Sequence, residues 1–218
     1  MDPDGNLCDP ATGDCTGAIP ATSSFQISNS AGFDDHWPEL AFDLTNEQFL
    51  VVYHRNTADI FGQRVSTSSL PVNSGSEITI SSAANNQRYP SVAYDSDNSA
   101  FFVVWMDDRP AGATENVYGQ AIDSSGSLIG TNLQISQVGP IPATQEDYVP
   151  TVYYDPQNQN FITFWIGLDG DDDLYYQRVN GSSGLVGNST SLQIDTSESP
   201  KYGSAAYYPV CRNFLVAY

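Results

Sequence analysis

The stretch YPSVAYDSDNSAFFVVW, residues 89–105, decides the fold of this chain because variants of it recur along the sequence. Residues 37–53 read WPELAFDLTNEQFLVVY and residues 149–165 read VPTVYYDPQNQNFITFW. A shorter copy, GSAAYYPVCRNFLVAY, occupies residues 203–218. Internal repetition of this length sets the architecture before any single residue does.

Each full copy contains four short runs rich in Val, Ile, Tyr, Phe and Trp, separated by Gly, Asn, Asp, Ser and Pro. The third run reads DIFGQRV, NVYGQAI or DLYYQRV, and the fourth reads ITIS, LQIS or LQID. Such runs are typical of β-strands, and no segment shows a helical period. Four strands about every 55 residues predict an all-β fold, a β-propeller of four-stranded antiparallel blades.

An aspartate and, three residues later, an asparagine recur between the first two runs of each copy. The pairs are Asp43 and Asn46, Asp95 and Asn98, and Asp155 and Asn158. An aspartate that caps its own turn, followed by an asparagine that tolerates left-handed φ, predicts a β-hairpin. The alternative interpretation is a set of metal ligands, but recurrence at a hairpin favours turn chemistry.

The strand count leaves the last blade incomplete. Residues 25–28, FQIS, match the fourth run and predict an opening strand, while residues 204–208 and 214–218 match the first two runs. The opening strand would serve as the fourth strand of the last blade, whose third strand has no counterpart. We expect that further blades follow or that a neighbouring chain supplies the missing strand. The residues assigned to this assembly are Cys211, Phe214, Val216, Tyr218, Phe25 and Ile27.

The motifs YPxVAYD, FxVVW and YGQR followed by LQIS resemble a repeat of large secreted and cell-surface proteins of bacteria and archaea. The resemblance covers about residues 25–218 and implies a propeller fold, with copies at about 37–82, 89–136, 149–195 and 202–218. It leaves function open, because propellers host binding, structural and catalytic roles. The Asp box of sialidases, Ser-x-Asp-x-Gly-x-Thr-Trp, is absent, and Asp123-Ser124-Ser125-Gly126 matches it only loosely.

Charge narrows the range of partners. The 26 acidic residues against 7 basic ones give a formal net charge of −19. This field repels phosphate backbones, so no nucleic acid partner is expected, whereas cations, neutral sugars and basic surfaces fit. The acidity is also typical of a solubilised extracellular protein. No apolar run approaches the roughly 18 residues of a membrane span.

The cysteines and sequons point to an extracellular or cell-surface location. Cys8 and Cys15 flank a turn-rich loop in the acidic extension, residues 1–24, and predict a disulfide in an oxidising compartment. Cys211 is then free, pairs between chains, or pairs with one of the other two. Asn180 and Asn188 begin N-glycosylation triplets. No signal peptide follows Met1, so we expect a removed leader or an excised segment.

Two acidic clusters are candidate Ca²⁺ sites, because carboxylate and amide oxygens are the ligands of this ion. The first resembles the calcium loops of thrombospondin-type or dockerin-like segments, although no glutamate stands at the twelfth position. The alternatives are a disulfide-pinned acidic loop for the first cluster and a solvated loop for the second. The candidate ligands are Asp2, Asp4, Asn6 and Asp9 in the first cluster and Asp169, Asp171 and Asp173 in the second.

No residue is predicted to be catalytic. Asp107 and Asp108, with Asp172 in the equivalent loop, are the best candidates for the paired carboxylates of a glycosidase. That chemistry needs two carboxyls about 5–10 Å apart, one with a raised pKa. Glycine-rich, solvent-facing loops lack this signature. His36 and His54 are the only histidines, and neither has the spacing of a catalytic triad.

Aromatic and basic positions divide into repeated and unrepeated ones. The repeated aromatics Tyr53, Trp105, Trp165 and Tyr218 are expected to pack between blades, and Arg64 and Arg178 to form salt bridges between blades. The unrepeated aromatics are the candidates for stacking against sugars; they are Trp37, Tyr89, Tyr148 and Tyr202.

The sequence as a whole predicts a non-enzymatic, extracellular structural or adhesive propeller module. We expect it to assemble with copies of itself or with further blades, into a filament or surface layer, through its incomplete last blade. The alternative is a multivalent carbohydrate-binding lectin with one shallow site per blade. A propeller glycosidase is a third, weaker interpretation.

Overall fold

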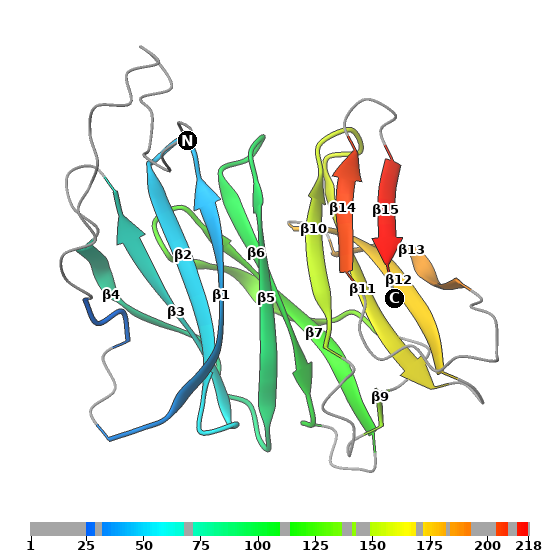
Figure 1. Ribbon diagram of the computed structural model, residues 1–218, viewed down its shortest axis with the longest axis horizontal. Helices are drawn as coiled ribbons and strands as arrows, with labels where there is room; N and C mark the ends of the chain where they lie inside the picture. Colours follow the sequence, from blue (N-terminus) through cyan, green and yellow to red (C-terminus); the bar gives the residue numbers. More distant parts are fainter. Residues whose placement is uncertain are drawn as a thin grey trace, which may run out of the picture.

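The computed structural model describes residues 25–28, 32–67, 72–109, 114–136, 141–142, 149–168, 172–181, 184–192, 204–208 and 213–217. Every regular element within these residues is a β-strand (Figure 1). The predicted all-β fold of antiparallel sheets is therefore confirmed. Over the same residues no helix is long and apolar enough to cross a membrane.

Four antiparallel sheets follow one another along the chain. The first contains β1 (Asp35–Asp43), β2 (Gln48–Arg55), β3 (Asp59–Ser66) and β4 (Val72–Ser81). The second contains β5 (Gln87–Asp95), β6 (Ala100–Asp107), β7 (Thr114–Asp123) and β8 (Leu128–Gln134), and the short β9 (Ile141–Pro142) pairs with β7. The third contains β10 (Thr151–Asp155), β11 (Asn160–Leu168), β12 (Asp172–Asn180) and β13 (Gly184–Leu192). The fourth contains β14 (Ser204–Tyr208) and β15 (Asn213–Ala217).

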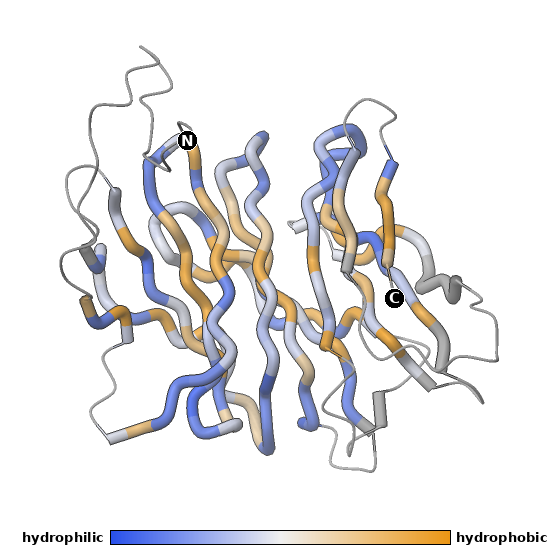
Figure 2. Tube along the Cα trace, viewed as in Figure 1, coloured by the Kyte–Doolittle hydropathy of each residue, from blue (hydrophilic) through white to orange (hydrophobic). Residues whose placement is uncertain are grey.

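The sheets stand side by side in sequence order, and the first strand of each lies next to the first strand of the following sheet (Figure 1). Interior sheets are therefore covered on both faces, which explains why β6 is a nearly continuous apolar run. Its odd positions, from Phe101 to Trp105, pack on the first sheet, and its even positions, from Phe102 to Met106, pack on the third. Figure 2 shows the apolar residues along the middle of these strands and polar residues at their ends.

The hairpin between the first two strands of each sheet is built by the aspartate that the sequence singled out. Asp43 Oδ1 accepts the amides of Thr45 and Asn46, both at 3.0 Å, and Asn46 Nδ2 donates to Oδ2 at 2.7 Å. The second and third sheets repeat the arrangement. The predicted turn chemistry is confirmed, but the residue with left-handed φ is the one after the asparagine, namely Glu47, Ser99 and Gln159.

Residues 25–28 do not form the expected opening strand. They lie against the first sheet, where Asn73 Nδ2 donates to the carbonyls of Gln26 at 3.0 Å and Ile27 at 2.9 Å. The Ile27 side chain packs on the apolar outer face of that sheet, beside Tyr53. The prediction that this segment completes the last sheet is therefore wrong, because the apolar face of the first sheet takes up the segment instead.

Two of the repeated aromatics, Trp105 and Trp165, pack between sheets as predicted, whereas the prediction is wrong for Tyr53. Trp105 is buried between the first and second sheets and Trp165 between the second and third, while Tyr53 is buried on the outer face of the first sheet. The expected salt bridges between blades are wrong. Arg178 pairs with Asp155 of its own sheet at 2.7 Å, and Arg64 reaches the next sheet only through a backbone carbonyl.

Candidate ligand pocket at the start of the first strands

A cavity of about 180 Å³ lies where the first strands of three successive sheets begin. Each sheet contributes a tripeptide from the same position of the repeat. The tripeptide consists of an apolar residue, a proline and a polar residue. The lining consists of Trp37-Pro38-Glu39, Tyr89-Pro90-Ser91 and Val149-Pro150-Thr151. Because the lining comes from three copies of one motif, the repeat itself assembles this pocket.

A β-bulge shapes the pocket wall in two of the copies. Pairing of β1 with β2 shifts between His36 and Glu39, and pairing of β5 with β6 shifts between Arg88 and Ser91. At these bulges Trp37 has φ of 52° and the equivalent Tyr89 has φ of 54°. Left-handed backbone is unfavourable for bulky residues, and doubly so before proline. Bulges re-aim side chains, and strained backbone of this kind concentrates at functional sites.

The two aromatic side chains have different roles. The rings of Trp37 and Tyr89 meet edge to face, with centroids 5.0 Å apart and an interplanar angle of 88°. Trp37 is 53% exposed, whereas Tyr89 is only 4% exposed. The Trp37 ring is therefore open to solvent, and the buried Tyr89 ring packs against it. The other two candidate stacking residues, Tyr148 and Tyr202, lie outside the described residues.

A buried histidine fixes the position of Tyr89. The Tyr89 amide donates to His54 Nδ1 at 3.2 Å, and the two rings stand perpendicular with centroids 5.6 Å apart. Burial, followed by the charges of His36 and Arg88, lowers the pKa of His54 to about 4. The imidazole is therefore neutral near pH 7, as its role as an acceptor requires. No sequence pattern predicts this contact, because the bulge at Tyr89 creates it.

A buried ion pair lies behind the same strand. Arg88 pairs with Glu115, which is almost fully buried, and the Arg88 guanidinium lies 5.6 Å from the centre of the Tyr89 ring. Burial raises the pKa of Glu115, against the opposing effect of Arg88. Glu115 Oε2 has no hydrogen-bond partner among the described residues. The pair supports the back of the pocket and lies outside its lining.

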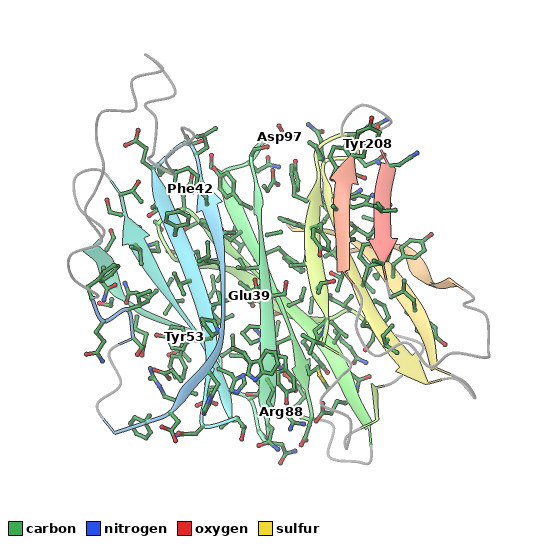
Figure 3. All side chains as sticks on the ribbon, in the orientation of Figure 1. Glu39, Phe42, Tyr53, Arg88, Asp97 and Tyr208 are labelled. Atoms are coloured by element: carbon green, nitrogen blue, oxygen red, sulfur yellow. The ribbon has the colours of Figure 1, made fainter. Side chains whose placement is uncertain are left out.

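Three polar groups complete the pocket, one from each copy. Glu39 stays accessible to solvent, and desolvation by the surrounding protein raises the pKa of its carboxyl. Ser91 Oγ accepts the amide of Val152 at 3.3 Å. Thr151 Oγ1 has no partner within the described part of the chain. Figure 3 shows Glu39 at the border between β1 and β5. The pocket thus combines an exposed indole with one carboxylate and two hydroxyls.

One of the two acidic residues considered for glycosidase chemistry in the second copy, Asp107, has a structural role. Asp107 is fully buried and accepts hydrogen bonds from Trp105 Nε1 at 2.8 Å and Arg109 Nη2 at 2.6 Å. Asp35, the neighbour of His36, pairs with Arg55 at 2.8 Å. Within the described ranges, no group of three or more His, Cys, Asp or Glu side chains is placed to hold a metal ion.

Several candidate residues fall outside the description. The structure describes only the backbone of Asp173 in β12 and of Asn188 in β13, and Asn180 ends β12. The candidates that lie outside the described residues are Asp2, Asp4, Asn6, Cys8, Asp9, Cys15, Asp169, Asp171, Cys211 and Tyr218.

The residues assigned to assembly at the last sheet face inward. Phe214 and Val216 pack against the third sheet, and the Phe214 ring lies 6.2 Å from that of Phe164. Leu215, between them, is 74% exposed. At the other end of the molecule, the N-terminal pair differs: Ile27 is packed and Phe25 is exposed.

Comparison with known proteins shows a similarity of fold and does not show a family. No protein-family model matches the chain, and no curated protein matches it. Among solved structures, the chain is similar to a crystal structure of an N-acetylgalactosamine deacetylase from F. plautii in complex with blood group B trisaccharide. The TM-score is 0.56 at 13% sequence identity, and the match covers 87% of this chain. The chain spans 63% of the length of that protein's chain, and identity this low shows the fold alone.

Proposed function

We propose that this chain is a non-enzymatic, extracellular adhesive module of β-propeller architecture that binds carbohydrate at the Trp37 pocket. Three features support the propeller arrangement: the internal repeat, the four-stranded antiparallel sheets, and the adjacency of their first strands. The observation that carries the binding function is the half-exposed Trp37 at the mouth of a cavity built by three copies.

The chemistry of the pocket suits a sugar. A pyranose has an apolar face that packs on an aromatic ring and a rim of hydroxyls that need hydrogen-bond partners. Trp37 supplies the ring, and Glu39 with the hydroxyls of Ser91 and Thr151 supplies polar groups around it. The bulge holds the indole in place before a ligand arrives, which lowers the ordering cost of binding.

The overall charge selects among sugars. A formal net charge of −19 disfavours sialylated and sulfated glycans through long-range repulsion. Neutral sugars and amino sugars are the class that fits. The carbohydrate complex of the fold relative agrees with this choice, although that protein's ligand and activity are its own.

The test is a glycan array followed by calorimetry on the variant W37A. We expect binding to neutral glycans, weakened at least about tenfold in W37A because the indole is a central contact. The matched control is Y208A, which removes an aromatic ring of similar exposure, 51%, from the last sheet. Flat array signals, or equal affinity of W37A and Y208A, would contradict the proposal.

A second candidate function is self-assembly, and the outer faces of the end sheets support it. Leu40 and Phe42 occupy the positions that Val92 and Tyr94 occupy in the second sheet, where they pack against the first. Leu40 is 58% exposed, and Figure 3 shows Phe42 on β1. We propose that the Leu215 face of a second copy covers this surface. The contact joins two different surfaces, so it repeats into a filament or closes into a ring.

Light scattering over a range of concentrations tests the assembly. We expect the mass to rise with concentration in the wild-type chain and to stay monomeric in L40E. The variant L44E, which adds the same charge in an exposed turn of the first sheet, should assemble like the wild type. A wild-type chain that is monomeric at every concentration rules the assembly out.

A further inference from the structure

The second copy differs from the other two at a pair of adjacent positions. The third strand has an arginine in two copies and alanine in the second, and the start of the second strand has an amide in two copies and again alanine in the second. The aligned sets are Arg64, Ala121 and Arg178 for the third strand, and Gln48, Ala100 and Asn160 for the second. Strand pairing places both positions of each copy at the same end of its sheet.

In the other copies the arginine fills this end of the sheet. Arg178 Nη1 donates to Asp155 Oδ2 at 2.7 Å and to Asn160 Oδ1 at 2.8 Å. Arg64 Nη1 donates to Gln48 Oε1 at 3.3 Å and to the carbonyl of Ser124, in the turn of the second sheet, at 3.2 Å. Each guanidinium therefore occupies the space beside the hairpin of its own sheet.

The second copy has a cavity at this place. Its volume is about 360 Å³, and it lies between the second and third sheets. Figure 3 places Asp97, in the adjoining hairpin, and Arg88, next to the Trp37 pocket, at opposite ends of the second sheet, so the two cavities are distinct. The lining includes Asp95, Ala100, Phe101, Ala121, Phe161 and Asn180.

The hairpin aspartate of this copy lacks the side-chain donor that the second or third strand of its own sheet supplies to its equivalents, and the hydroxyl of Tyr154 in the next sheet interacts with it instead. Asp95 is buried, and its Oδ2 accepts one hydrogen bond among the described residues, from Asn98 Nδ2 at 2.8 Å. In the equivalents, Oδ2 accepts a second side-chain donor, which is Gln48 Nε2 on Asp43 at 3.1 Å and Arg178 Nη1 on Asp155 at 2.7 Å. The cavity thus adjoins a buried carboxylate that lacks the strand donor of its equivalents.

We propose that this cavity binds a guanidinium group supplied from outside the chain, either by free arginine or agmatine or by an arginine side chain of a peptide. The bound group takes the place that the protein's own arginine occupies in the other copies. A planar guanidinium pairs with a carboxylate more specifically than an ammonium does, and the cavity places Asp95 beside the apolar side chains of Ala121 and Phe161. The strongly negative chain also concentrates cations around itself.

The binding is tested by titrating the ¹⁵N-labelled chain and following the amide signals of Ala100, Ala121 and Gly181. We expect saturable shifts with arginine and agmatine, and shifts at least about tenfold weaker with lysine. The blocked peptides acetyl-Gly-Arg-Gly-amide and acetyl-Gly-Lys-Gly-amide form the second arm. Tighter binding of the arginine peptide identifies a protein side chain as the source, and tighter binding of agmatine or free arginine identifies a small molecule.

Two kinds of variant locate the site. The pair A100Q/A121R restores the residues of the first copy and should abolish binding by filling the cavity, and A121Q, a milder change, should also block it. The control L44R adds the same charge in an exposed turn and should bind arginine like the wild type. D95N should weaken binding about tenfold or more, with an otherwise unchanged amide spectrum.

Two results would overturn the proposal. One is the absence of saturable shifts with any guanidinium compound, which would leave the cavity as a space filled by solvent. The other is an identical titration of A121Q and L44R, which would place the binding on the general acidic surface. W37A should titrate with arginine like the wild type, so failure of sugar binding and failure of this inference are distinguishable.

Discussion

Burial within the repeat changes the pKa of individual side chains, and His54 shows this most clearly. It is buried and accepts the Tyr89 amide, so only its neutral form fits. Sequence reasoning identified Trp37 and Tyr89 as unrepeated aromatics with possible binding roles. It missed His54, because a histidine at the end of a strand carries no sign of the bulge that will face it.

The pKa of His54 predicts a pH dependence of stability. Its folded value of about 4 lies below the ordinary value of 6.5, so the unfolded chain binds the proton more readily. The contribution is fully present above about pH 6.5 and is lost as the pH falls toward 4, by at most about 3 kcal/mol. Urea unfolding at several pH values measures it. H54Q should flatten the curve in this window, whereas H36Q, which alters an exposed histidine, should change it little.

Asp43 carries a second prediction about a single residue. It is fully buried, and although burial raises its pKa, hydrogen bonds led by that of Tyr94 lower the pKa overall. D43A leaves its donors unpaired and should lower the free energy of unfolding by about 2–4 kcal/mol. The donors are Thr45, Asn46, Gln48 and Tyr94. D34A, at an aspartate before β1, should cost under about 0.5 kcal/mol in the same denaturant titration.

The strands themselves were the most predictable elements. The run FFVVW and its copies predicted β2, β6 and β11, because alternate apolar residues on both faces require a neighbour on each side. The two failures are short segments. Residues 25–28 match a strand in sequence but have no ladder to join, and β9 has two residues and leaves no pattern. Pairing of such segments depends on tertiary neighbours, which sequence alone does not supply.

Two glycines at equivalent positions of the third strands predict unequal effects of one substitution. A Cβ at Gly119 would lie 2.6 Å from Phe102 Cζ and 2.8 Å from Ile135 Cδ1. A Cβ at Gly62 would meet the flexible end of Ile80 at 3.0 Å. G119A should therefore destabilise the chain by about 1–3 kcal/mol, and G62A by less. Thermal unfolding of the two variants decides, and equal midpoints would argue against the tight packing of β7.

At the scale of the whole molecule, charge and packing oppose each other. The packed sheets bury three clusters of apolar side chains, while the acidic residues that give a net charge of −19 repel one another across the surface. Salt screens this repulsion, with a Debye length of about 10 Å at 0.1 M. Raising sodium chloride from about 0.05 to 0.5 M should therefore raise the thermal midpoint by a few degrees. Scanning calorimetry checks the shift, and a midpoint that falls with salt would show that attractive ion pairs dominate instead.

The alanine pair between the second and third sheets has a consequence for engineering. The contact between the first and second sheets has the same backbone arrangement as the contact between the second and third. There the side chains of Gln48 and Arg64 occupy the space that is a cavity in the second copy. The substitutions Q48A and R64A would remove these side chains and leave the carbonyl of Ser124 without its two side-chain donors. The double variant would have two guanidinium-binding cavities, one on each side of the second sheet. The number of guanidinium groups that one chain binds would then depend on which copies of the repeat keep their arginine.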